Sequence, residues 1–304
     1  MLLKGSFVVY VLLNICYATA FFVYPPWAAQ VLVLAGRGPD CHREEGLQAF
    51  ARRCSQKDIE RRVLSQSRLV RRDADGLQLM ETPKGKFWEP VIDGTVIVPQ
   101  IAEFEAKYSG FPRPIHPGDI VLDCGANVGA FTREAVEEGA AVVVAIEPAP
   151  NNVESLRRNF AAEIAAGKVI VYPKGVWDKD DFLTLAINNT TSAMDSFVIN
   201  EDTHPGVRVP LTTIDKLVVE LKLPRVDFIK MDIEGAEKRA LAGGAKTLAA
   251  YHPRMEISVD HLPEDPQMVP VVIRQIQPDY RIQCLETELH RKQLRLDAGI
   301  LYFY

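Results

Sequence analysis

The sequence lacks several features that would point to common functions. Its five cysteines form no C-x-x-C pair and no cysteine–histidine cluster with zinc spacing, so a structural zinc site is not expected. A net charge of -5 and a pI near 5.8 leave no surplus of positive charge, which argues against general nucleic-acid binding. There is no internal repeat or low-complexity tract. With 304 residues, 47% of them hydrophobic, the chain can instead form one large core and a smaller appendage.

The most informative segment is IVLDCGANVGAFTREAVEEGAAVVVAIEP, residues 120–148, which predicts a strand, a glycine-containing turn, a helix and a second strand. The glycines let the backbone of the turn approach a ligand closely. Glu147 follows the second strand, about 20 residues after the turn, at the edge where doubly wound sheets bind ligands. A carboxylate there can accept hydrogen bonds from both hydroxyls of a ribose. We therefore expect an adenosine-containing cofactor, bound by Asp123, Gly125, Ala126, Asn127, Gly129, Glu147 and Pro148.

The chemistry of this turn favours S-adenosylmethionine over a dinucleotide. Dinucleotide sites use G-x-G-x-x-G, because the pyrophosphate lies against bare backbone at a helix N-terminus. Here the turn reads D-C-G-A-N-V-G, with Asp123 before the first glycine and Asn127 where a glycine would be expected. An acid suits a cofactor with a cationic amino-acid end and no phosphate. An ordinary strand–turn–helix without a ligand is the alternative explanation.

Five blocks of the chain, in order, resemble the FkbM-type S-adenosylmethionine-dependent methyltransferases. The segment VDFIKMDIEGAEKRALAGG, residues 226–244, is similar to the most distinctive segment of the family. The resemblance covers about residues 85–304. The other blocks are VLDCGANVGAFT (121–132), AIEPAPNNVESLRRN (145–159), VPLTTIDKL (209–217), and PRMEIS (253–258) together with the final ILYFY.

Predicted strands alternate with predicted helices after Glu147, which indicates an α/β fold with a parallel sheet covered on both faces. The resemblance implies a Rossmann-like class I methyltransferase, whose mostly parallel, doubly wound sheet has an antiparallel C-terminal strand. Asp93-Gly94 between apolar flanks predicts a β-hairpin over residues 87–98. The expected division is an N-terminal membrane anchor or signal segment (1–36), a helical connector (37–84) and the methyltransferase domain (85–304).

Candidate catalytic residues follow the later strands, because doubly wound sheets place their sites at the carboxyl ends of strands. Methyl transfer from a sulfonium is an in-line displacement, so the nucleophile must be aligned and must lose its proton. Asp232 and Glu234 directly follow the predicted strand 226–231. Like charges in a partly dry cleft raise the pKa of at least one carboxyl group, as a general base requires. Alternatively, the pair could bind a divalent metal ion that polarises the acceptor hydroxyl.

Other polar residues are expected near this pair. Lys230 ends an apolar strand and is predicted to pair with one of the acids, and Glu256 is predicted to face the same cleft from the next strand. His261 is a candidate base, although an isolated loop histidine is more often incidental. Glu237 is equally well explained as an acid at a helix N-terminus. We assign catalytic roles to Asp232, Glu234, Lys230 and Glu256; a loop containing Ser192 and Asp195 is expected to cover the cofactor.

The N-terminus predicts a membrane anchor. Residues 7–24 carry no charge and are just long enough to cross a bilayer as a helix, which Pro25 and Pro26 would end. A cleavable signal peptide is the alternative, but the residues after Ala20 stay apolar. Arginines follow the segment while Lys4 alone precedes it, so the positive-inside tendency places the catalytic part in the cytoplasm. A lumen-facing domain remains the alternative, because residues 188–191 contain two overlapping glycosylation sequons.

The cysteines leave the compartment open. Cys41 and Cys54 could pair if the chain is exported, and Cys284 would then be odd, whereas Cys124 is expected to be a small packing residue. The arginines between residues 52 and 72 alternate with acids and predict a solvated helix face.

Together these features predict an S-adenosylmethionine-dependent methyltransferase that acts on a hydroxyl oxygen. The resemblance implies acceptors among sugars, glycans or secondary metabolites, and the composition predicts no nucleic-acid partner. Two alternatives stay open. One is an NAD-dependent oxidoreductase, and the other is a membrane-bound scaffold that keeps the fold without catalysis.

Overall fold

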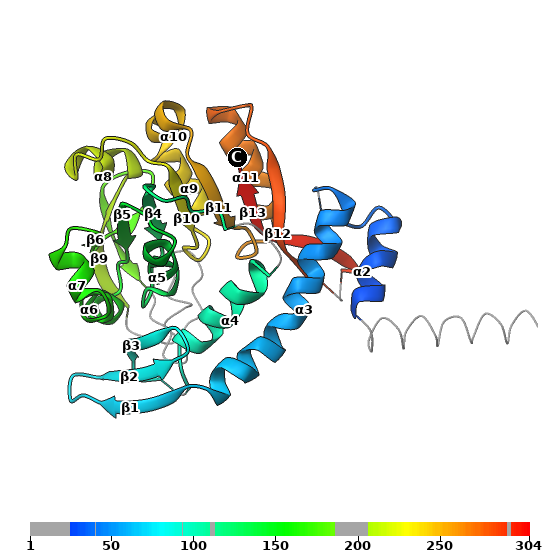
Figure 1. The fold of residues 1–304 in the computed structure, drawn as a ribbon. Helices are drawn as coiled ribbons and strands as arrows, with labels where there is room; N and C mark the ends of the chain where they lie inside the picture. Colours follow the sequence, from blue (N-terminus) through cyan, green and yellow to red (C-terminus); the bar gives the residue numbers. More distant parts are fainter. Residues whose placement is uncertain (1–24, 40, 93, 110–112, 186–205, 291–292) are drawn as a thin grey trace, which may run out of the picture.

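A seven-stranded sheet forms the centre of the protein, in the order β12-β13-β11-β10-β4-β5-β6 (Figure 1). The structure, a computed structural model, describes residues 25–39, 41–92, 94–109, 113–185, 206–290 and 293–304. The strands of the central sheet are β4 (Ile120–Cys124), β5 (Val142–Ile146), β6 (Val169–Tyr172), β10 (Phe228–Met231), β11 (Arg254–Ser258), β12 (Ile282–His290) and β13 (Arg295–Phe303).

Most of this sheet is parallel. Strands β6, β5, β4, β10 and β11 pair in parallel, whereas β13 pairs antiparallel with both β11 and β12. The predicted mostly parallel sheet with an antiparallel C-terminal strand is therefore confirmed. The last two strands, β12 and β13, have nine residues each and form a long hairpin.

Helices cover both faces of the sheet, as a doubly wound fold requires. Successive residues of β4 show this, because Val121 belongs to the apolar cluster on one face and Leu122 to the cluster on the other. The first face packs against α4, α5 and α6, and the second against α8, α9, α10 and α11. The helices outside the N-terminal region are α5 (Ala130–Glu137), α6 (Pro150–Asn159), α7 (Ala161–Ala165), α8 (Ile214–Glu220), α9 (Glu237–Ala242), α10 (Ala245–Tyr251) and α11 (Asp265–Ile276).

Two small sheets flank the centre. One is antiparallel, in the order β1-β2-β3, and the other has the order β7-β9-β8. The predicted division between residues 84 and 85 falls in the turn between β2 and β3, so the connector contains strands as well as a helix. The remaining strands are β1 (Arg68–Arg72), β2 (Leu77–Thr82), β3 (Gly85–Pro90), β7 (Gly175–Val176), β8 (Asp181–Leu185) and β9 (Val207–Thr212).

The hairpin predicted over residues 87–98 is wrong. Strand β3 pairs with the preceding β2, and the chain then enters helix α4 (Ile97–Lys107). The buried carboxylate of Glu89 stabilises the start of this helix by accepting hydrogen bonds from the backbone N–H groups of Val96 and Ile97, at 2.9 and 2.8 Å. Ile97, Val98 and Ile101 are buried at helical spacing. The apolar run after Gly94 therefore belongs to a helix.

The N-terminal part of the described chain packs on the domain. Helix α2 (Pro25–Leu34) buries Ala28, Ala29, Leu32 and Val33 beside α3 (Arg43–Ser65) and the β12–β13 hairpin. Among the helices in the described ranges, none is both long and apolar enough to cross a membrane. The predicted anchor, residues 7–24, lies outside the described residues and stays a prediction.

The predicted pairing of Cys41 with Cys54 is wrong, because Cys41 forms a disulfide with Cys284 on β12. The chain turns into α3 immediately after Cys41, and at a rise of about 1.5 Å per residue Cys54 lies about 16 Å further along that helix. Cys54 is exposed and free, and Cys124 is free and buried, as expected of a packing residue. The disulfide joins residues 243 positions apart.

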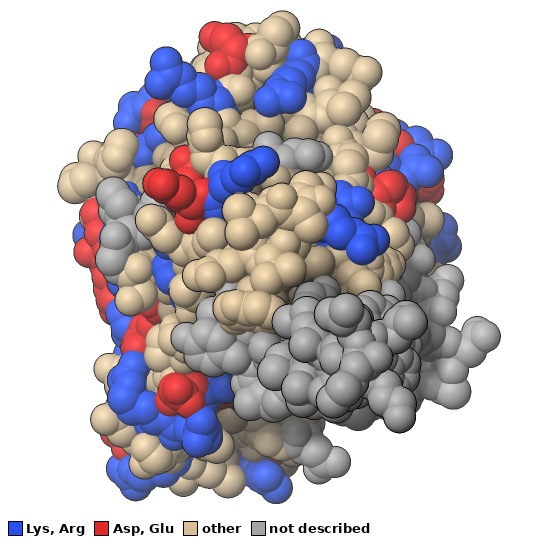
Figure 2. Space-filling model, turned by 90° about the vertical axis from the view of Figure 1, so that its right-hand side faces the viewer, with Lys and Arg blue, Asp and Glu red and all other residues tan. Residues whose placement is uncertain are grey.

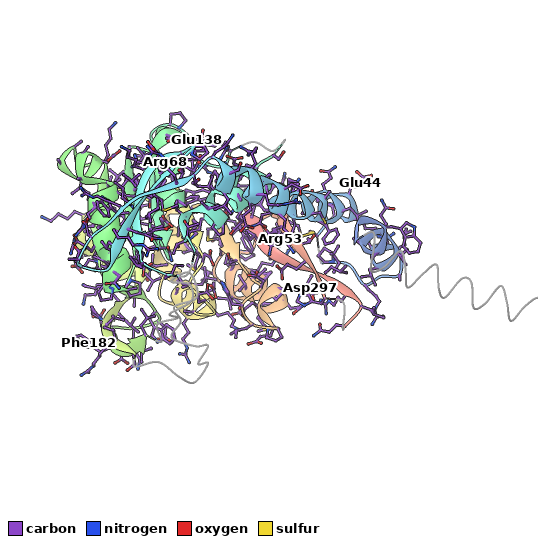
Figure 3. All side chains as sticks on the ribbon, turned by 90° about the horizontal axis from the view of Figure 1, so that it is seen from below. Glu44, Arg53, Arg68, Glu138, Phe182 and Asp297 are labelled. Atoms are coloured by element: carbon purple, nitrogen blue, oxygen red, sulfur yellow. A yellow bond between two sulfur atoms is a disulfide. The ribbon has the colours of Figure 1, made fainter. Side chains whose placement is uncertain are left out.

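The arginines of α3 are also less solvated than predicted. Arg53 pairs with Glu286 at 3.0 Å and with Glu288 at 2.7 Å, and Figure 3 shows it on the side of α3 that faces the C-terminal hairpin. Arg52 donates to the carbonyl oxygen of Leu285 at 3.1 Å. Elsewhere on the surface, basic and acidic side chains lie next to one another over much of the face in Figure 2.

Removing the Cys41–Cys284 disulfide should lower the stability of the fold. We expect Cys41→Ser combined with Cys284→Ser to reduce the free energy of unfolding by about 2–4 kcal/mol, because the unfolded chain loses a long-range constraint. Urea unfolding of the oxidised protein would measure this. Cys54→Ser is the matched control and should change stability by less than about 0.5 kcal/mol. Equal stability of the double variant and the unaltered protein would contradict a formed disulfide.

Candidate active site

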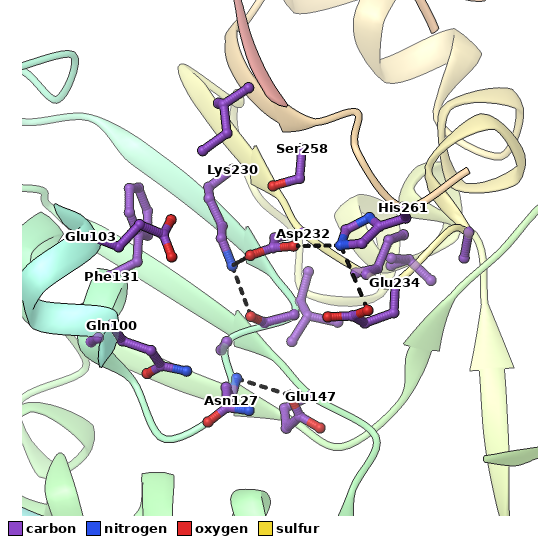
Figure 4. A pocket seen from close by; sticks show the side chains of 18 of the residues that line it. Gln100, Glu103, Asn127, Phe131, Glu147, Lys230, Asp232, Glu234, Ser258 and His261 are labelled. Carbon is purple, nitrogen blue, oxygen red and sulfur yellow. Dashed lines mark hydrogen bonds and ion pairs between the residues drawn. The ribbon is translucent and has the colours of Figure 1, made fainter. Parts of the chain in front are cut away.

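One cavity lies at the carboxyl ends of β4, β5, β10 and β11 (Figure 4). Its floor is the turn after β4 together with the residues after β5, and its opposite side is formed by α4 and the segments after β10 and β11. Its lining includes Arg53, Gln100, Glu103, Phe104, Lys107, Gly125, Ala126, Asn127, Glu147, Pro148, Lys230, Asp232, Glu234, Ser258, Asp260, His261 and Glu286.

The turn after β4 is fixed to the end of β5. Gly125 and Ala126 both donate from their backbone N–H groups to the carbonyl oxygen of Ile146, at 3.0 Å. Glu147 accepts a hydrogen bond from the backbone N–H of Asn127 at 2.9 Å and another from that of Ala149 at 2.8 Å. These bonds hold the Glu147 carboxylate at the cavity wall. This is the position from which Glu147 is predicted to bind a ribose. Ala126 and Pro148 line the same wall.

Gly125 has a positive φ of 80° and lies against the segment that follows β10. A Cβ atom at this position would lie 1.9 Å from the carbonyl oxygen of Asp232, a distance that atoms cannot adopt. The absence of a side chain therefore allows the ends of β4 and β10 to meet. Gly129, also at positive φ, has a comparable role away from the cavity, because a Cβ there would lie 2.3 Å from the ring of Phe160.

Asp123 lies behind the turn and does not line the cavity. It is fully buried, accepts a hydrogen bond from the Thr132 hydroxyl at 2.6 Å, and lies 3.5 Å from Nζ of Lys230. The prediction that Asp123 directly contacts the cationic end of a cofactor is therefore wrong, because its side chain does not reach the cavity. Burial raises the pKa of the Asp123 carboxyl group although Lys230 opposes the shift. In this geometry Asp123 anchors Lys230.

Lys230 connects the two sides of the site. Its ammonium donates to the carbonyl oxygen of Gly125 at 2.8 Å and lies 3.8 Å from the nearer carboxylate oxygen of Asp232. Burial disfavours the charged form, but the neighbouring Asp123 and Asp232 carboxylates raise the pKa of Lys230. It is therefore a cation that positions these groups, and it has no free base form with which to take a proton.

Asp232, Glu234 and His261 form a compact group that we call the carboxylate–histidine cluster. Nε2 of His261 lies 3.3 Å from Oδ1 of Asp232 and 3.6 Å from Oε2 of Glu234. Nδ1 of the same ring lies 3.0 Å from the buried Glu237 carboxylate. Glu234 adopts a positive φ of 55°, which is unusual for a residue with a Cβ atom. The lone loop histidine that the sequence left ambiguous is therefore part of the site.

The charges of this cluster are strongly coupled. Burial favours neutral Asp232, but Lys230 and His261 hold the pKa of that carboxyl group well below its usual range. Burial lowers the pKa of His261, but its hydrogen bonds with Asp232 and Glu237 outweigh this and raise the pKa to about 12. Burial, together with the charges of Asp232 and Glu237, raises the pKa of Glu234 to about 7. The raised carboxyl pKa therefore belongs to Glu234 rather than to Asp232.

Glu256 is not part of the cavity lining, which corrects the prediction that it faces the cleft. It is buried one layer beneath, where it accepts hydrogen bonds from Nζ of Lys107, at 2.5 Å, and from the hydroxyl of Tyr108. Both partners lie at the C-terminal end of α4. The Glu256–Lys107 ion pair thus joins α4 to β11 and fixes one wall of the cavity.

Several lining residues were not anticipated. Gln100, Glu103 and Phe104 come from α4, and Arg53 from α3. The i, i+3 spacing of Gln100 and Glu103 on a helix would have revealed the first two if residues 97–107 had been recognised as helical. Ser192 and Asp195, the residues proposed to cover the cofactor, lie outside the described residues.

Gly125→Ala should prevent the site from forming. We expect this variant to lose cofactor binding and to unfold at lower temperature, because the new methyl group would overlap the Asp232 carbonyl oxygen. Gly76→Ala is a matched control, since Gly76 also has positive φ (83°) but has no atom within 4 Å of the added Cβ. It should cost only about 1 kcal/mol of backbone strain. Calorimetric titration with the cofactor and thermal unfolding would be measured for both variants. Equal cofactor affinity and equal unfolding temperature of the two variants would contradict a role for the contact between Gly125 and the Asp232 carbonyl oxygen.

The mostly parallel, doubly wound sheet, with the antiparallel β13 between β11 and β12, is that of the α/β methyltransferase fold. Residues 123–283, more than half of the chain, match the methyltransferase FkbM domain. The chain belongs to the FkbM methyltransferase family.

Individual relatives are more distant. The chain is 27% identical to 31-O-demethyl-FK506 methyltransferase FkbM of Streptomyces tacrolimicus, over 42% of this chain and 60% of that protein. It is also 27% identical to Methyltransferase 1 of Beauveria bassiana (strain ARSEF 2860), over 43% of this chain and 60% of that protein. The chain thus spans about 60% of the length of these curated relatives. The crystal structure of the methyltransferase FkbM from Methylobacillus flagellatus KT is similar, with 22% identity, a TM-score of 0.47, and coverage of 70% of this chain and 56% of that one.

Proposed function

We propose that the protein transfers a methyl group from S-adenosylmethionine to a hydroxyl oxygen of its acceptor. The observation that carries this proposal is that the Asn127–Glu147 wall and the carboxylate–histidine cluster line one and the same cavity. A cofactor on that wall would direct its reactive end toward the cluster. Family membership supports the same class of reaction.

The cofactor half of the cavity suits adenosine and a short zwitterionic chain. The Glu147 carboxylate can accept hydrogen bonds from two ribose hydroxyls, while the backbone of Gly125 and Ala126 lies bare at the cavity wall. An acidic wall disfavours a pyrophosphate, which would lie close to Glu147, Asp232 and Glu234. This charge argument favours the sulfonium cofactor over NAD.

The transfer is a displacement at carbon. An oxygen lone pair of the acceptor forms a bond to the methyl carbon as the carbon–sulfur bond breaks, and S-adenosylhomocysteine leaves as a neutral thioether. The hydroxyl proton passes to a carboxylate of the cluster and then to water. Asp232 and Glu234 supply oxygen acceptors at the carboxyl end of β10, where they can align the hydroxyl before attack.

The acceptor is proposed to be polyhydroxylated, as sugars, glycans and many secondary metabolites are. Gln100 and Glu103 on α4, together with Ser258 and Asp260 after β11, give the second half of the cavity many hydrogen-bonding groups. Phe104 of the same helix adds apolar surface. The name of the Streptomyces relative specifies O-methylation of a hydroxylated compound. A scaffold without catalysis would not require such a lined cavity.

Two variants should separate cofactor binding from catalysis. Glu147→Ala is expected to weaken S-adenosylmethionine binding at least ten-fold, because it removes the acceptor for the ribose. Asp232→Asn should bind the cofactor normally but lose at least 100-fold in kcat, because alignment of the hydroxyl depends on its charge. Calorimetry with S-adenosylmethionine and with NAD as a parallel titrant, followed by turnover on a panel of hydroxylated acceptors, would test both. Binding of NAD alone, or full turnover by Asp232→Asn, would overturn the proposal.

We further propose that the catalytic domain matures on the oxidising side of a membrane, to which residues 7–24 attach it. The support is the Cys41–Cys284 disulfide, because structural disulfides persist in oxidising compartments and are rare in the cytosol. This favours the lumen-facing arrangement over the cytoplasmic one suggested by the arginines.

Thiol labelling of the protein taken directly from its cells would test this location. With rapid alkylation before lysis, we expect Cys54 to be modified and Cys41 and Cys284 to become reactive only after reduction. Cys54 serves as an internal control because it is exposed and unpaired in the structure. Alkylation of Cys41 and Cys284 without reductant would place the domain in a reducing compartment.

A further inference from the structure

We propose that the carboxylate–histidine cluster binds one divalent metal ion, held by Asp232, Glu234 and Nε2 of His261. The three side chains come from separate positions after β10 and β11 and each turns one ligand atom toward the others, as Figure 4 shows. These atoms all lie within 4.8 Å of one another. The site faces the cavity, so an ion bound there would contact the acceptor.

The separations between His261 and the two carboxylates are close to those of ligands around a metal ion. Two bonds of about 2.1 Å place their ligand atoms about 3.0 Å apart at a right angle and about 3.4 Å apart at the tetrahedral angle. Nε2 of His261 lies 3.3 Å from the Asp232 oxygen and 3.6 Å from the Glu234 oxygen. The imidazole nitrogen is therefore at a ligand–ligand separation from each carboxylate, and the two carboxylate oxygens, within 4.8 Å of one another, would only have to draw closer to share one ion.

Glu237 orients the histidine for this role. Its Oε1 accepts a hydrogen bond from the backbone N–H of Ile233 at 2.9 Å and lies 3.0 Å from Nδ1 of His261. A carboxylate oxygen accepts hydrogen bonds, so Nδ1 carries a hydrogen and keeps it when an ion binds. Nε2, which also carries a hydrogen between Asp232 and Glu234 when no ion is bound, would give up that hydrogen and ligate the ion with its lone pair. A second carboxylate that fixes the tautomer of a ligating histidine is a common feature of metal centres. Glu237 is thus a positioning residue and not a ligand.

The charge balance also suits a cation. Three carboxylates, those of Asp232, Glu234 and Glu237, surround the one imidazole, and Glu237 is completely buried. Lys230 is the nearest ammonium, but it is shared with Asp123 and lies on the far side of Asp232. A divalent ion that takes the place of the Nε2 proton of His261 would lie among these three carboxylates, whose negative charges would offset its own.

Two oxygens and one imidazole nitrogen indicate which ions fit. Oxygen ligands suit Mn²⁺, whereas imidazole suits transition metals more than Mg²⁺ or Ca²⁺. A mixed set with three protein ligands leaves coordination positions for a hydroxyl of the acceptor, whose proton the ion would make more acidic. This catalytic use rests on the proposed function; binding of the ion does not.

Binding of Mn²⁺ to the full-length protein tests the inference directly. Loss of the electron paramagnetic resonance signal of free Mn²⁺ should show one saturable site per chain. We expect His261→Ala and Asp232→Asn each to weaken this site at least ten-fold, and Glu237→Gln to weaken it about ten-fold through loss of ring orientation. His252→Ala is the matched control, since His252 pairs with Asp279 away from the cavity. Thermal unfolding identifies any variant that fails to fold. If His261→Ala fails to fold, the Mn²⁺ affinity of the isosteric Asp232→Asn variant tests the site.

The outcomes separate this inference from the proposed function. Absence of a saturable Mn²⁺ site in the unaltered protein, or retention of the site by both His261→Ala and Asp232→Asn, would overturn the metal site. Either result, combined with normal S-adenosylmethionine binding and turnover, would leave the methyltransferase proposal intact. Conversely, Glu147→Ala should lose the cofactor while it keeps the Mn²⁺ site.

Discussion

The buried ammonium of Lys230 is the interaction on which the site depends. It contacts the Gly125 carbonyl oxygen of the β4 turn and lies within 4 Å of carboxylates on both β4 and β10. Without this cation, the fully buried Asp123 would be an uncompensated charge, which costs several kcal/mol. The cation is available because β4 and β10 are neighbours in register, with Lys230 opposite Asp123. One charged side chain therefore connects the cofactor turn to the catalytic edge.

The same junction explains why the backbone matters as much as the side chains. Gly125 lets the turn after β4 touch the Asp232 carbonyl group. The same turn is hydrogen-bonded to the end of β5. The positions of Glu147 and Asp232 are thus set by one continuous network of short contacts. A cofactor and an acceptor must meet to within a fraction of an ångström, and a network of this kind supplies that accuracy.

Sequence reasoning predicted the parts of the fold that depend on local patterns. The buried runs of β4 and β5 and the glycine turn between them were visible in the order of residues, and so were Asp232 and Glu234. What it missed depends on tertiary contacts. Asp93-Gly94 is a strong hairpin signal, yet the Glu89 carboxylate, seven residues before Val96, favours a helix there. The partner of Cys41 lies 243 residues away, and no local pattern specifies it. His261 is ambiguous in the sequence because its partners come from another strand.

The N-terminal region is more than a connector, because it completes the wall of the cavity opposite the β4 turn. Arg53 of α3 lines the cavity and pairs with Glu286, itself a lining residue, so α3 must be seated on β12 for this wall to exist. The Cys41–Cys284 disulfide fixes the start of α3 to that same strand. At the other end of the wall, the Lys107–Glu256 ion pair fixes α4 to β11. The polar residues at the ends of β4 and β10 are thus combined with a wall built from helices outside the matched domain, residues 123–283. Under the proposed function, residues of that wall, rather than those of the turn, are therefore the ones that distinguish one acceptor from another.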